Sequence, residues 1–303
     1  MTILITGGTG LVGTALSQIL VSQQHRVIVL SRSEQAAHNG LEYAKWDVDA
    51  QTIDRKAIGA ADVIIHLAGT NIAEKRWTKK RKKEIRDSRV QSCALLVHAL
   101  KTYPNKVHTV VSASAIGWYG RDQQKKPEPF AESQEAAVGF LGETCTLWEA
   151  AITQVRSLGK RLVIVRCGIV LSKEGGALPE FRKPLRFGIA PIIGSGKQVI
   201  SWIHIDDVCR LYLEGVNNPN LDGVYNAVAP VPCSNRKLTM ELSKKIRGES
   251  FLPIHVPAFV LQLILGGMSI ELLKSTTVSS KKIQLTGFQF QFPTIESALR
   301  NLV

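Results

Sequence analysis

The stretch Ile3-Leu4-Ile5-Thr6-Gly7-Gly8-Thr9-Gly10-Leu11-Val12-Gly13 decides the fold. Its apolar start predicts a buried strand, and the residues after it show the apolar spacing of a helix. The three spaced glycines permit a tight turn, close approach of a pyrophosphate and close packing of helix on strand, while free N–H groups at the helix start face the anion. The stretch therefore predicts a dinucleotide site formed by Gly7, Thr9, Gly10, Leu11, Val12 and Gly13.

Strand-like and helix-like patterns alternate along the chain. The expected strands cover residues 26–30, 41–46, 63–67, 107–112 and 162–165, and the expected helices cover 11–24, 78–102 and 139–158. This alternation predicts an α/β fold with a doubly wound parallel sheet of the Rossmann type. We expect residues 1–170 and 201–231 to form the nucleotide-binding domain, and residues 171–200 and 232–303 to form a smaller substrate or lid domain. Substrate would lie in the cleft between the two.

Composition narrows the class of protein. The chain has 303 residues, of which 45% are hydrophobic and 21% charged, as expected of a globular protein. Its five cysteines are widely spaced, and no His/Cys/Asp cluster has metal-ligand spacing, so we predict no metal site and a reducing compartment. Because the first strand starts at the initiator methionine, no leader fits before it and we expect a cytoplasmic protein. The oligomeric state is unreadable from the sequence.

The longest apolar run covers residues 256–265. It contains Pro257 and Gln262 and is far shorter than a membrane span. We interpret it as a helix packed on the protein, and we expect no membrane partner.

A basic segment lies at residues 75–89. It holds nine bases and two acids, so +7 of the net charge of +13 is concentrated there. The favoured interpretation is the solvated first half of an amphipathic helix. The alternatives are a surface for an anionic small molecule and, less favoured because Trp77 is the only interleaved aromatic residue, a nucleic-acid surface.

The end of the second strand indicates the cofactor. An acid at this position binds the 2′-hydroxyl of NAD(H), whereas a base pairs with the 2′-phosphate of NADP(H). Here Arg32 stands beside Ser31, and both residue types suit a phosphate, so we favour NADP(H). The alternative is an exposed arginine with Glu34 in the acidic role. Further along the chain, the expected cofactor contacts are Asp47 at the adenine edge and Leu67, Ala68 and Gly69 near the phosphates and nicotinamide ribose.

Several motifs together resemble the extended short-chain dehydrogenases/reductases. They are the glycine turn, Leu67-Ala68-Gly69, Ser112-Ala113-Ser114 and Ser201-Trp202-Ile203-His204-Ile205-Asp206-Asp207. More narrowly, Arg76-Trp77, Ser88-Arg89, Arg166-Cys167-Gly168 and the C-terminal Thr286-Gly287-Phe288-Gln289-Phe290 resemble the epimerase-family subgroup 39U. The resemblance implies that Ser112, Cys145 and Arg166 border the cofactor, and that Arg76, Trp77 and Trp202 border the substrate pocket. Asp206 or Asp207 would cap the helix that follows His204.

The usual catalytic pair of this superfamily is missing. Active members use Tyr-x-x-x-Lys, and extended members carry a Glu four residues after the lysine. With Glu149 as that Glu, Leu141 and Cys145 occupy the tyrosine and lysine positions. The remaining catalytic candidates are Ser114, matching the superfamily serine, and the loop residue Tyr119, whose alternative role is packing beneath the substrate.

The sequence thus predicts an NADP(H)-binding, epimerase- or oxidoreductase-like protein that acts on a small polar molecule, with an anionic molecule as one alternative. An alternative is a catalytically silent, NADPH-sensing regulatory protein, an idea supported by the cell-division label that similar chains have carried. A weaker alternative is the nucleic-acid surface on the basic segment.

Overall fold

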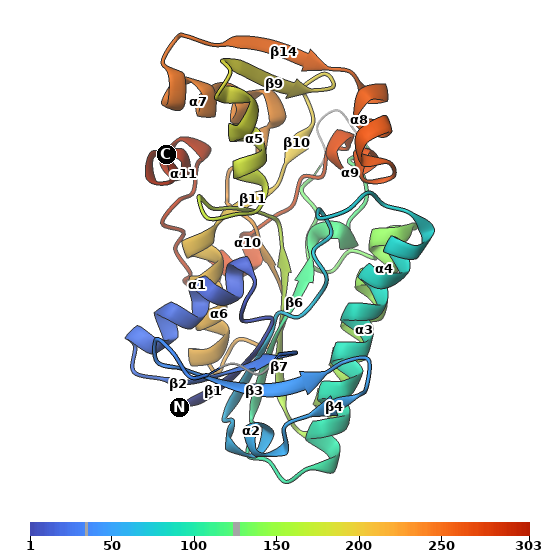
Figure 1. Ribbon diagram of the computed structural model, residues 1–303, viewed down its shortest axis with the longest axis vertical. Coiled ribbons are helices and arrows are strands. Elements are labelled where there is room, and N and C mark those ends of the chain that lie inside the picture. Colours follow the sequence, from blue (N-terminus) through green and yellow to red (C-terminus); the bar gives the residue numbers. More distant parts are fainter. Residues whose placement is uncertain (34–35, 124–127) are drawn as a thin grey trace.

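A central eight-stranded sheet organises the N-terminal part of the computed structural model, which describes residues 1–33, 36–123 and 128–303 (Figure 1). The strand order is β12-β7-β6-β5-β1-β2-β3-β4, and every neighbouring pair is parallel except β3 with β4. The bounds are β1 Thr2–Thr6, β2 Arg26–Ser31, β3 Leu41–Asp47, β4 Thr52–Ile53, β5 Val63–His66, β6 Thr109–Ala115, β7 Arg161–Cys167 and β12 Gly223–Ala227. The predicted doubly wound α/β fold is confirmed.

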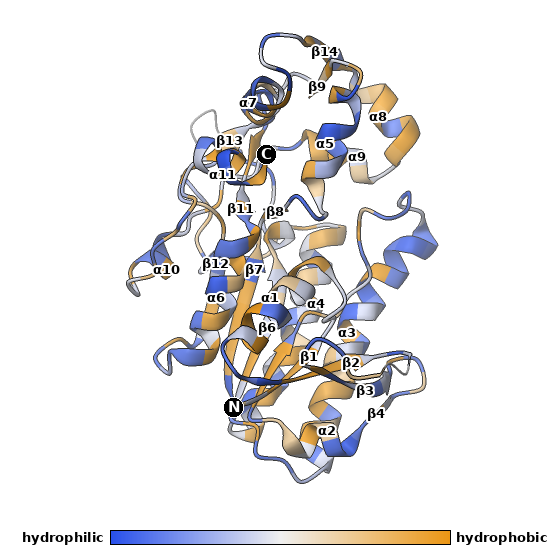
Figure 2. Ribbon diagram, turned by 60° about the vertical axis from the view of Figure 1, so that its left-hand side comes forward, coloured by the Kyte–Doolittle hydropathy of each residue, from blue (hydrophilic) through white to orange (hydrophobic). Residues whose placement is uncertain are grey.

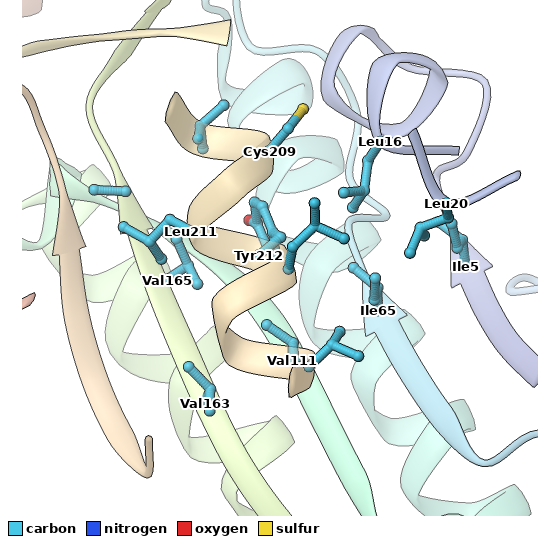
Figure 3. Close-up of a cluster of buried hydrophobic side chains, with 14 of the residues drawn as sticks. Ile5, Leu16, Leu20, Ile65, Val111, Val163, Val165, Cys209, Leu211 and Tyr212 are labelled. Carbon is cyan, nitrogen blue, oxygen red and sulfur yellow. The ribbon is translucent and has the colours of Figure 1, made fainter. Parts of the chain in front are cut away.

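Helices cover both faces of this sheet. The helices α1 (Leu11–Ser22) and α6 (Ile205–Asn217) pack on one face, where Figure 3 shows Leu16, Leu20 and Tyr212 meeting side chains of the central strands. On the other face lie α2 (Arg55–Ala60), α3 (Lys79–Thr102) and α4 (Phe140–Thr153). Short 3-10 turns follow β6 and α4 at Ile116–Trp118 and Gln154–Leu158. Burial of each large apolar side chain contributes about 1.5–3 kcal/mol, so these two layers hold the strand ends in fixed positions.

A second lobe lies at the carboxyl ends of the strands, in the upper half of Figure 1. Its own apolar core includes Leu178, Leu238 and Leu299 and is separate from the two cores around the sheet. Residues near Ile283 and Phe288 leave this lobe and pack against the first core. The bounds are β8 Ile169–Leu171, α5 Ala177–Leu185, β9 Ile189–Ile193, β10 Val199–Ile200, β11 Trp202–His204, β13 Cys233–Ser234, α7 Asn235–Arg247, β14 Leu252–Val256, α8 Ala258–Leu265, α9 Met268–Leu273, α10 Lys281–Gln284 and α11 Ile295–Leu302.

His204, rather than either aspartate, caps α6. Its Nδ1 accepts a hydrogen bond from the backbone N–H of Asp206 at 3.0 Å, and its other ring nitrogen lies 3.1 Å from Asn301 Oδ1. Burial lowers the pKa of His204, which favours this neutral, accepting form. The buried Asp207 instead accepts hydrogen bonds from the backbone of Gln291 and Phe292. The expectation of an aspartate cap is therefore wrong, and Asp207 instead ties α6 to the C-terminal segment.

The apolar run at 256–265 forms the predicted helix, α8, but only one side of it packs on the protein. Leu261 is buried, whereas Phe259, Leu263 and Ile264 are 71%, 76% and 63% exposed. The predicted packing is therefore only partly right, because a single side chain of the helix reaches the interior. Across the described residues, no helix combines the length and the apolar character needed to cross a bilayer.

Candidate functional site

The glycine turn joins β1 to α1 with backbone geometry that side chains would disturb. Gly7 has φ +68°, and a Cβ on it would come within 2.8 Å of the carbonyl group of Leu67. A Cβ on Gly13 would overlap the carbonyl oxygen of Gly7. Gly10 occupies the N-cap of α1 and has no side chain to occupy the first N–H groups of the helix. The turn thus leaves those N–H groups available to an anion.

The turn lies at the topological switch point of the sheet. β1 is flanked by β2 on one side and β5 on the other, and the chain winds outward in both directions from this pair. A cleft of about 1080 Å³ opens there. Nine of the predicted cofactor residues line it: Gly7, Thr9, Gly10, Ser31, Arg32, Asp47, Leu67, Ala68 and Gly69.

Arg32 lies at the end of β2 on the rim of this cleft. Its side chain is exposed and forms no ion pair with any of the described carboxylates. Hydroxyl groups of Ser31 and Ser33 lie beside it, 3.4 Å apart. Glu34, the acidic alternative, lies outside the described residues. Arg32 therefore offers a planar cation, without a carboxylate partner among the described residues, next to two hydroxyl groups, which suits a phosphate.

Asp47 forms part of the same wall at the end of β3. Its Oδ1 accepts hydrogen bonds from the backbone N–H groups of Asp49 and Ala50, both at 2.9 Å. The carboxylate therefore shapes the turn to β4 as well as lining the cleft.

The opposite wall comes from the first half of α3, which the sequence analysis favoured as a solvated face. Lys80, Arg81 and Lys83 all line the cleft. Arg81 is buried and binds Glu74 at 3.0 Å and Glu84 at 3.1 Å, so part of the charge of the basic segment is neutralised inside the wall. The sequence signal for this placement was the position of the segment directly after the loop that follows β5.

A buried histidine connects the cleft floor to α3. Thr6 Oγ1 accepts hydrogen bonds from the N–H groups of Leu67 and Ala68, both at 3.1 Å, and lies 2.8 Å from His66 Nδ1. Because the hydroxyl oxygen accepts twice, its proton points to Nδ1, which leaves Nε2 protonated toward Ser92 at 3.3 Å. Burial lowers the pKa of His66 to about 4, so the ring is neutral. No motif or spacing in the sequence points to this histidine.

Tyr119 and Ser114, the two catalytic candidates, lie in a closed polar network instead of the cleft. The Tyr119 hydroxyl donates to Asn226 Oδ1 at 2.8 Å and accepts from Arg166 Nη1 at 3.0 Å, and burial raises its pKa. Ser114 donates to Glu149 Oε1 at 2.6 Å. Both side chains are buried. This corrects the expectation that Tyr119 reaches the pocket; packing beneath it was the alternative role.

Arg166 also belongs to this network and is absent from the cleft lining. Its guanidinium forms a two-point ion pair with Glu149, with N–O distances of 2.8 and 2.9 Å, and lies 3.7 Å from the Trp118 ring centre. Ser112 is buried, and its hydroxyl donates to the carbonyl of Ala113. Neither residue presents its polar group to the cleft that the glycine turn lines.

The positions of the missing catalytic pair carry no proton-transfer group. Leu141 packs against Gly117. Burial raises the pKa of Cys145 to about 12, so its thiol stays protonated and faces the carbonyl of Ala115 at 3.7 Å. A cation missed by the sequence analysis lies near it: Arg89 packs its guanidinium against Gly69 and over the Trp148 ring at 5.0 Å.

The expected substrate residues do not meet at one site. Trp202 is fully buried in the core of the second lobe, and its indole N–H donates to the carbonyl of Val231 at 3.2 Å. Trp77 is buried beside Phe140, with its ring centre 5.1 Å away. Arg76 is exposed and packs against Gly266. The expectation for Trp202 is corrected because the indole fills the lobe core.

The remaining predicted contacts, Leu11, Val12 and Gly13, lie in the first turn of α1. Gly13 acts on the turn through close packing, and Leu11 lies against Gly175 and Gly176 of the second lobe. They support the glycine turn from behind, outside the cleft lining.

Known proteins match the whole chain. Residues 3–228 match the model of the NAD dependent epimerase/dehydratase family, and residues 256–302 match a domain of unknown function, DUF1731. The chain is 35% identical over 309 residues to epimerase family protein SSP1921 of Staphylococcus saprophyticus, covering 99% of this chain and 98% of the relative.

Solved structures agree with the fold. The human epimerase family protein SDR39U1, solved with NADPH, matches with a TM-score of 0.87 and 29% identity over 100% of this chain and 99% of that one. MoeE5, solved with UDP-glucuronic acid and NAD, matches at 19% identity with a TM-score of 0.78, covering 99% and 97%, and shows the fold alone. The resemblance found in the sequence is confirmed, and the chain belongs to the NAD dependent epimerase/dehydratase family.

Proposed function

We propose that the protein binds NADP(H) in the cleft at the switch point and acts, as an epimerase- or oxidoreductase-like protein, on a small polar, anionic molecule. The observation that carries this proposal is the guanidinium of Arg32, which pairs with no described carboxylate and lies in the same cleft as the glycine turn. A 2′-phosphate is doubly charged near neutral pH, and Arg32 with Ser31 and Ser33 matches it. The related human structure contains NADPH, which supports the same choice.

The residues of the cleft divide the work of binding. The glycine turn would hold the pyrophosphate at the start of α1, and Asp47 would meet the adenosine side. The wall formed by Leu67, Ala68 and Gly69 would lie along the nicotinamide ribose, with the Arg89 guanidinium behind it. When bound, the nicotinamide supplies a hydride acceptor or donor.

Proton transfer would then not use Tyr119 or Ser114, because both hydroxyls are enclosed by partners. Water or groups of the substrate would have to carry the proton. A substrate that is acidic enough to lose its own proton fits such a site best.

A second function is favoured by the same network. A protein that keeps its nucleotide cleft while its polar catalytic candidates serve packing can act as an NADPH-sensing regulator, related to cell division or another process. A pull-down whose captured partner changes with NADPH would favour this function. Oxidation or reduction of the cofactor with any carbonyl or sugar-nucleotide substrate would favour the enzyme.

The test of the cofactor proposal compares NADPH and NADH binding to the wild type and to Arg32→Ala. Loss of a charge-assisted contact of about 1.5–3 kcal/mol predicts about 10- to 100-fold weaker NADPH binding with little change for NADH. Arg26→Ala, at the start of the strand that precedes Arg32 and paired with Glu42 at the surface, is the control and should change neither affinity. Equal binding of both cofactors by the wild type would refute the NADP(H) assignment.

A further inference from the structure

The outer end of the second lobe exposes large apolar side chains that no part of the described chain covers. We call this region the distal apolar surface: Phe187, Ile189, Leu252, Ile254, Phe259, Leu263, Ile264 and Ile270. It comprises half of the sixteen large hydrophobic residues that are exposed in the described chain. Figure 2 shows α8, within this region, as a largely hydrophobic ribbon at the upper end of the molecule.

The first part of the surface is one face of a small sheet. β9 and β14 pair in parallel, with Ile189 opposite Leu252. Residues Ala190 and Ile192 of β9 alternate with Ile189 and are buried in the lobe. Since alternate side chains of a strand point to opposite faces, Ile189, Leu252 and Ile254 share the outward face. Phe187, just before β9, is 84% exposed.

The second part is the helix that follows β14. None of the eight residues of α8 carries a charge, and Leu261 is its buried anchor. Phe259 and Leu263, four residues apart, share the helix face opposite that anchor, and Ile264 and, on α9, Ile270 are exposed beside this face. Exposing such an apolar helix face to water raises the free energy of the protein, and burial against an apolar phase would remove this cost.

Basic side chains border the surface at the β14 end. Lys244, Lys245 and Arg247 form the exposed last turn of α7, and Arg247 lies within 3.7 Å of the position that a Cβ on Gly188 would take. Arg186, also exposed, directly precedes Phe187.

Basic side chains border the α8 end as well. Arg76 packs against Gly266, at the end of α8, and Lys82 lies 3.7 Å from the Cβ position of Gly267. Both belong to the basic segment 75–89, much of which the nucleotide cleft does not use. The apolar surface is therefore bordered by cations at both ends.

We propose that the distal apolar surface, with these basic borders, binds the surface of an anionic lipid bilayer. Apolar side chains entering the headgroup boundary and bases at its edge are the two signals that together give stable, reversible attachment. A second copy of the chain fits less well, because a symmetric pairing of the surface would bring its own basic borders face to face. The sequence-based expectation of no membrane partner considered only a spanning helix.

The experiment is co-sedimentation of the full chain with vesicles of phosphatidylcholine, with or without phosphatidylserine. We expect binding to the mixed vesicles that falls as NaCl rises, and little binding to phosphatidylcholine alone. The double variant Phe259→Ser/Leu263→Gln should bind at least about tenfold more weakly. Neutralising Lys244, Lys245 and Arg247 should weaken binding about fivefold per base.

Two variants serve as matched controls. Leu285→Gln removes an equally exposed apolar side chain directly after α10, and Lys56→Ser removes an exposed base on α2 at the opposite end of the molecule (Figure 1). Both should bind like the wild type, and thermal melting should show that every variant is folded.

Three results would overturn the proposal. One is a wild type that stays in solution with the mixed vesicles at low salt; another is equal loss of binding in the control variants. The third is unchanged vesicle binding in variants that lose a different interaction. Such an interaction would be a dimer abolished by Leu263→Gln, or oligonucleotide binding abolished by neutralising Lys244, Lys245 and Arg247.

Discussion

Acid should lower the free energy of unfolding through His66, and a variant of this one residue can isolate its contribution. The folded protein holds this ring neutral, with its pKa lowered to about 4 by burial, whereas an unfolded chain protonates it near 6.5. Below pH 6.5 the unfolded state therefore binds a proton that the folded state does not. The stability that His66 contributes is complete above pH 6.5 and is lost as the pH falls toward 4.

The size of this loss follows from the difference between the two pKa values. Each unit is worth about 1.4 kcal/mol, so the free energy of unfolding should fall by about 3 kcal/mol between pH 6.5 and 4 from this side chain alone. Paired carboxylates such as Glu42 and Asp62 have lowered pKa values and add losses at lower pH. The comparison of His66→Gln with the wild type isolates the histidine.

The assay is urea unfolding at a series of pH values. His66→Gln should start less stable but lose less stability on acidification, so the two curves should converge by about 3 kcal/mol. His98→Gln, an exposed histidine on α3, is the control and should follow the wild type. Parallel curves for the wild type and His66→Gln between pH 6.5 and 4 would refute the reasoning.

The remaining predictions concern the turn and the buried network. Gly13→Ala should abolish nucleotide binding, measured by NADPH fluorescence, because its Cβ overlaps the turn. The Cβ of Gly10→Ala meets only one carbonyl oxygen, at 3.3 Å, so this variant should bind NADPH more weakly without losing binding. Equal affinities of the two variants would contradict the packing argument. Glu149→Gln should lower the free energy of unfolding by about 3–5 kcal/mol because it leaves the Arg166 charge unpaired, whereas the exposed control Glu143→Gln should change it by less than about 0.5 kcal/mol. If denaturant unfolding shows the same loss of unfolding free energy for both variants, the ion pair does not stabilise the fold as argued.

The sheet could be predicted from the sequence because local patterns determine it. Apolar runs and the glycine turn are signals contained within a few consecutive residues. The strands of the sheet and the cleft residues Gly7 and Arg32 could therefore be predicted from the sequence. Even so, the strand expected at 107–112 runs from Thr109 to Ala115, because pairing with β7 extends it.

Long-range partners explain what the sequence did not reveal. The Tyr119 hydroxyl donates a hydrogen bond to Asn226, 107 residues away. The Trp202 indole donates one to Val231 in a lobe whose core is built from distant segments. No spacing rule reports such contacts, so a polar residue in a loop looks equally suited to catalysis and to packing. The exposure of α8 could not be predicted for the same reason. An apolar helix pattern indicates burial, and only the positions of distant segments show which of its faces is covered.

The buried pair of Glu149 and Arg166 limits which side chains position 145 can accept. A lysine at position 145 would place its ammonium group in the low-dielectric space that already holds the guanidinium groups of Arg89 and Arg166, with Glu149 as the nearby carboxylate. Three cations against one anion would repel one another there, so the single change Cys145→Lys should lower the free energy of unfolding. Installing a lysine at position 145 would therefore require a change in the buried charges around it as well.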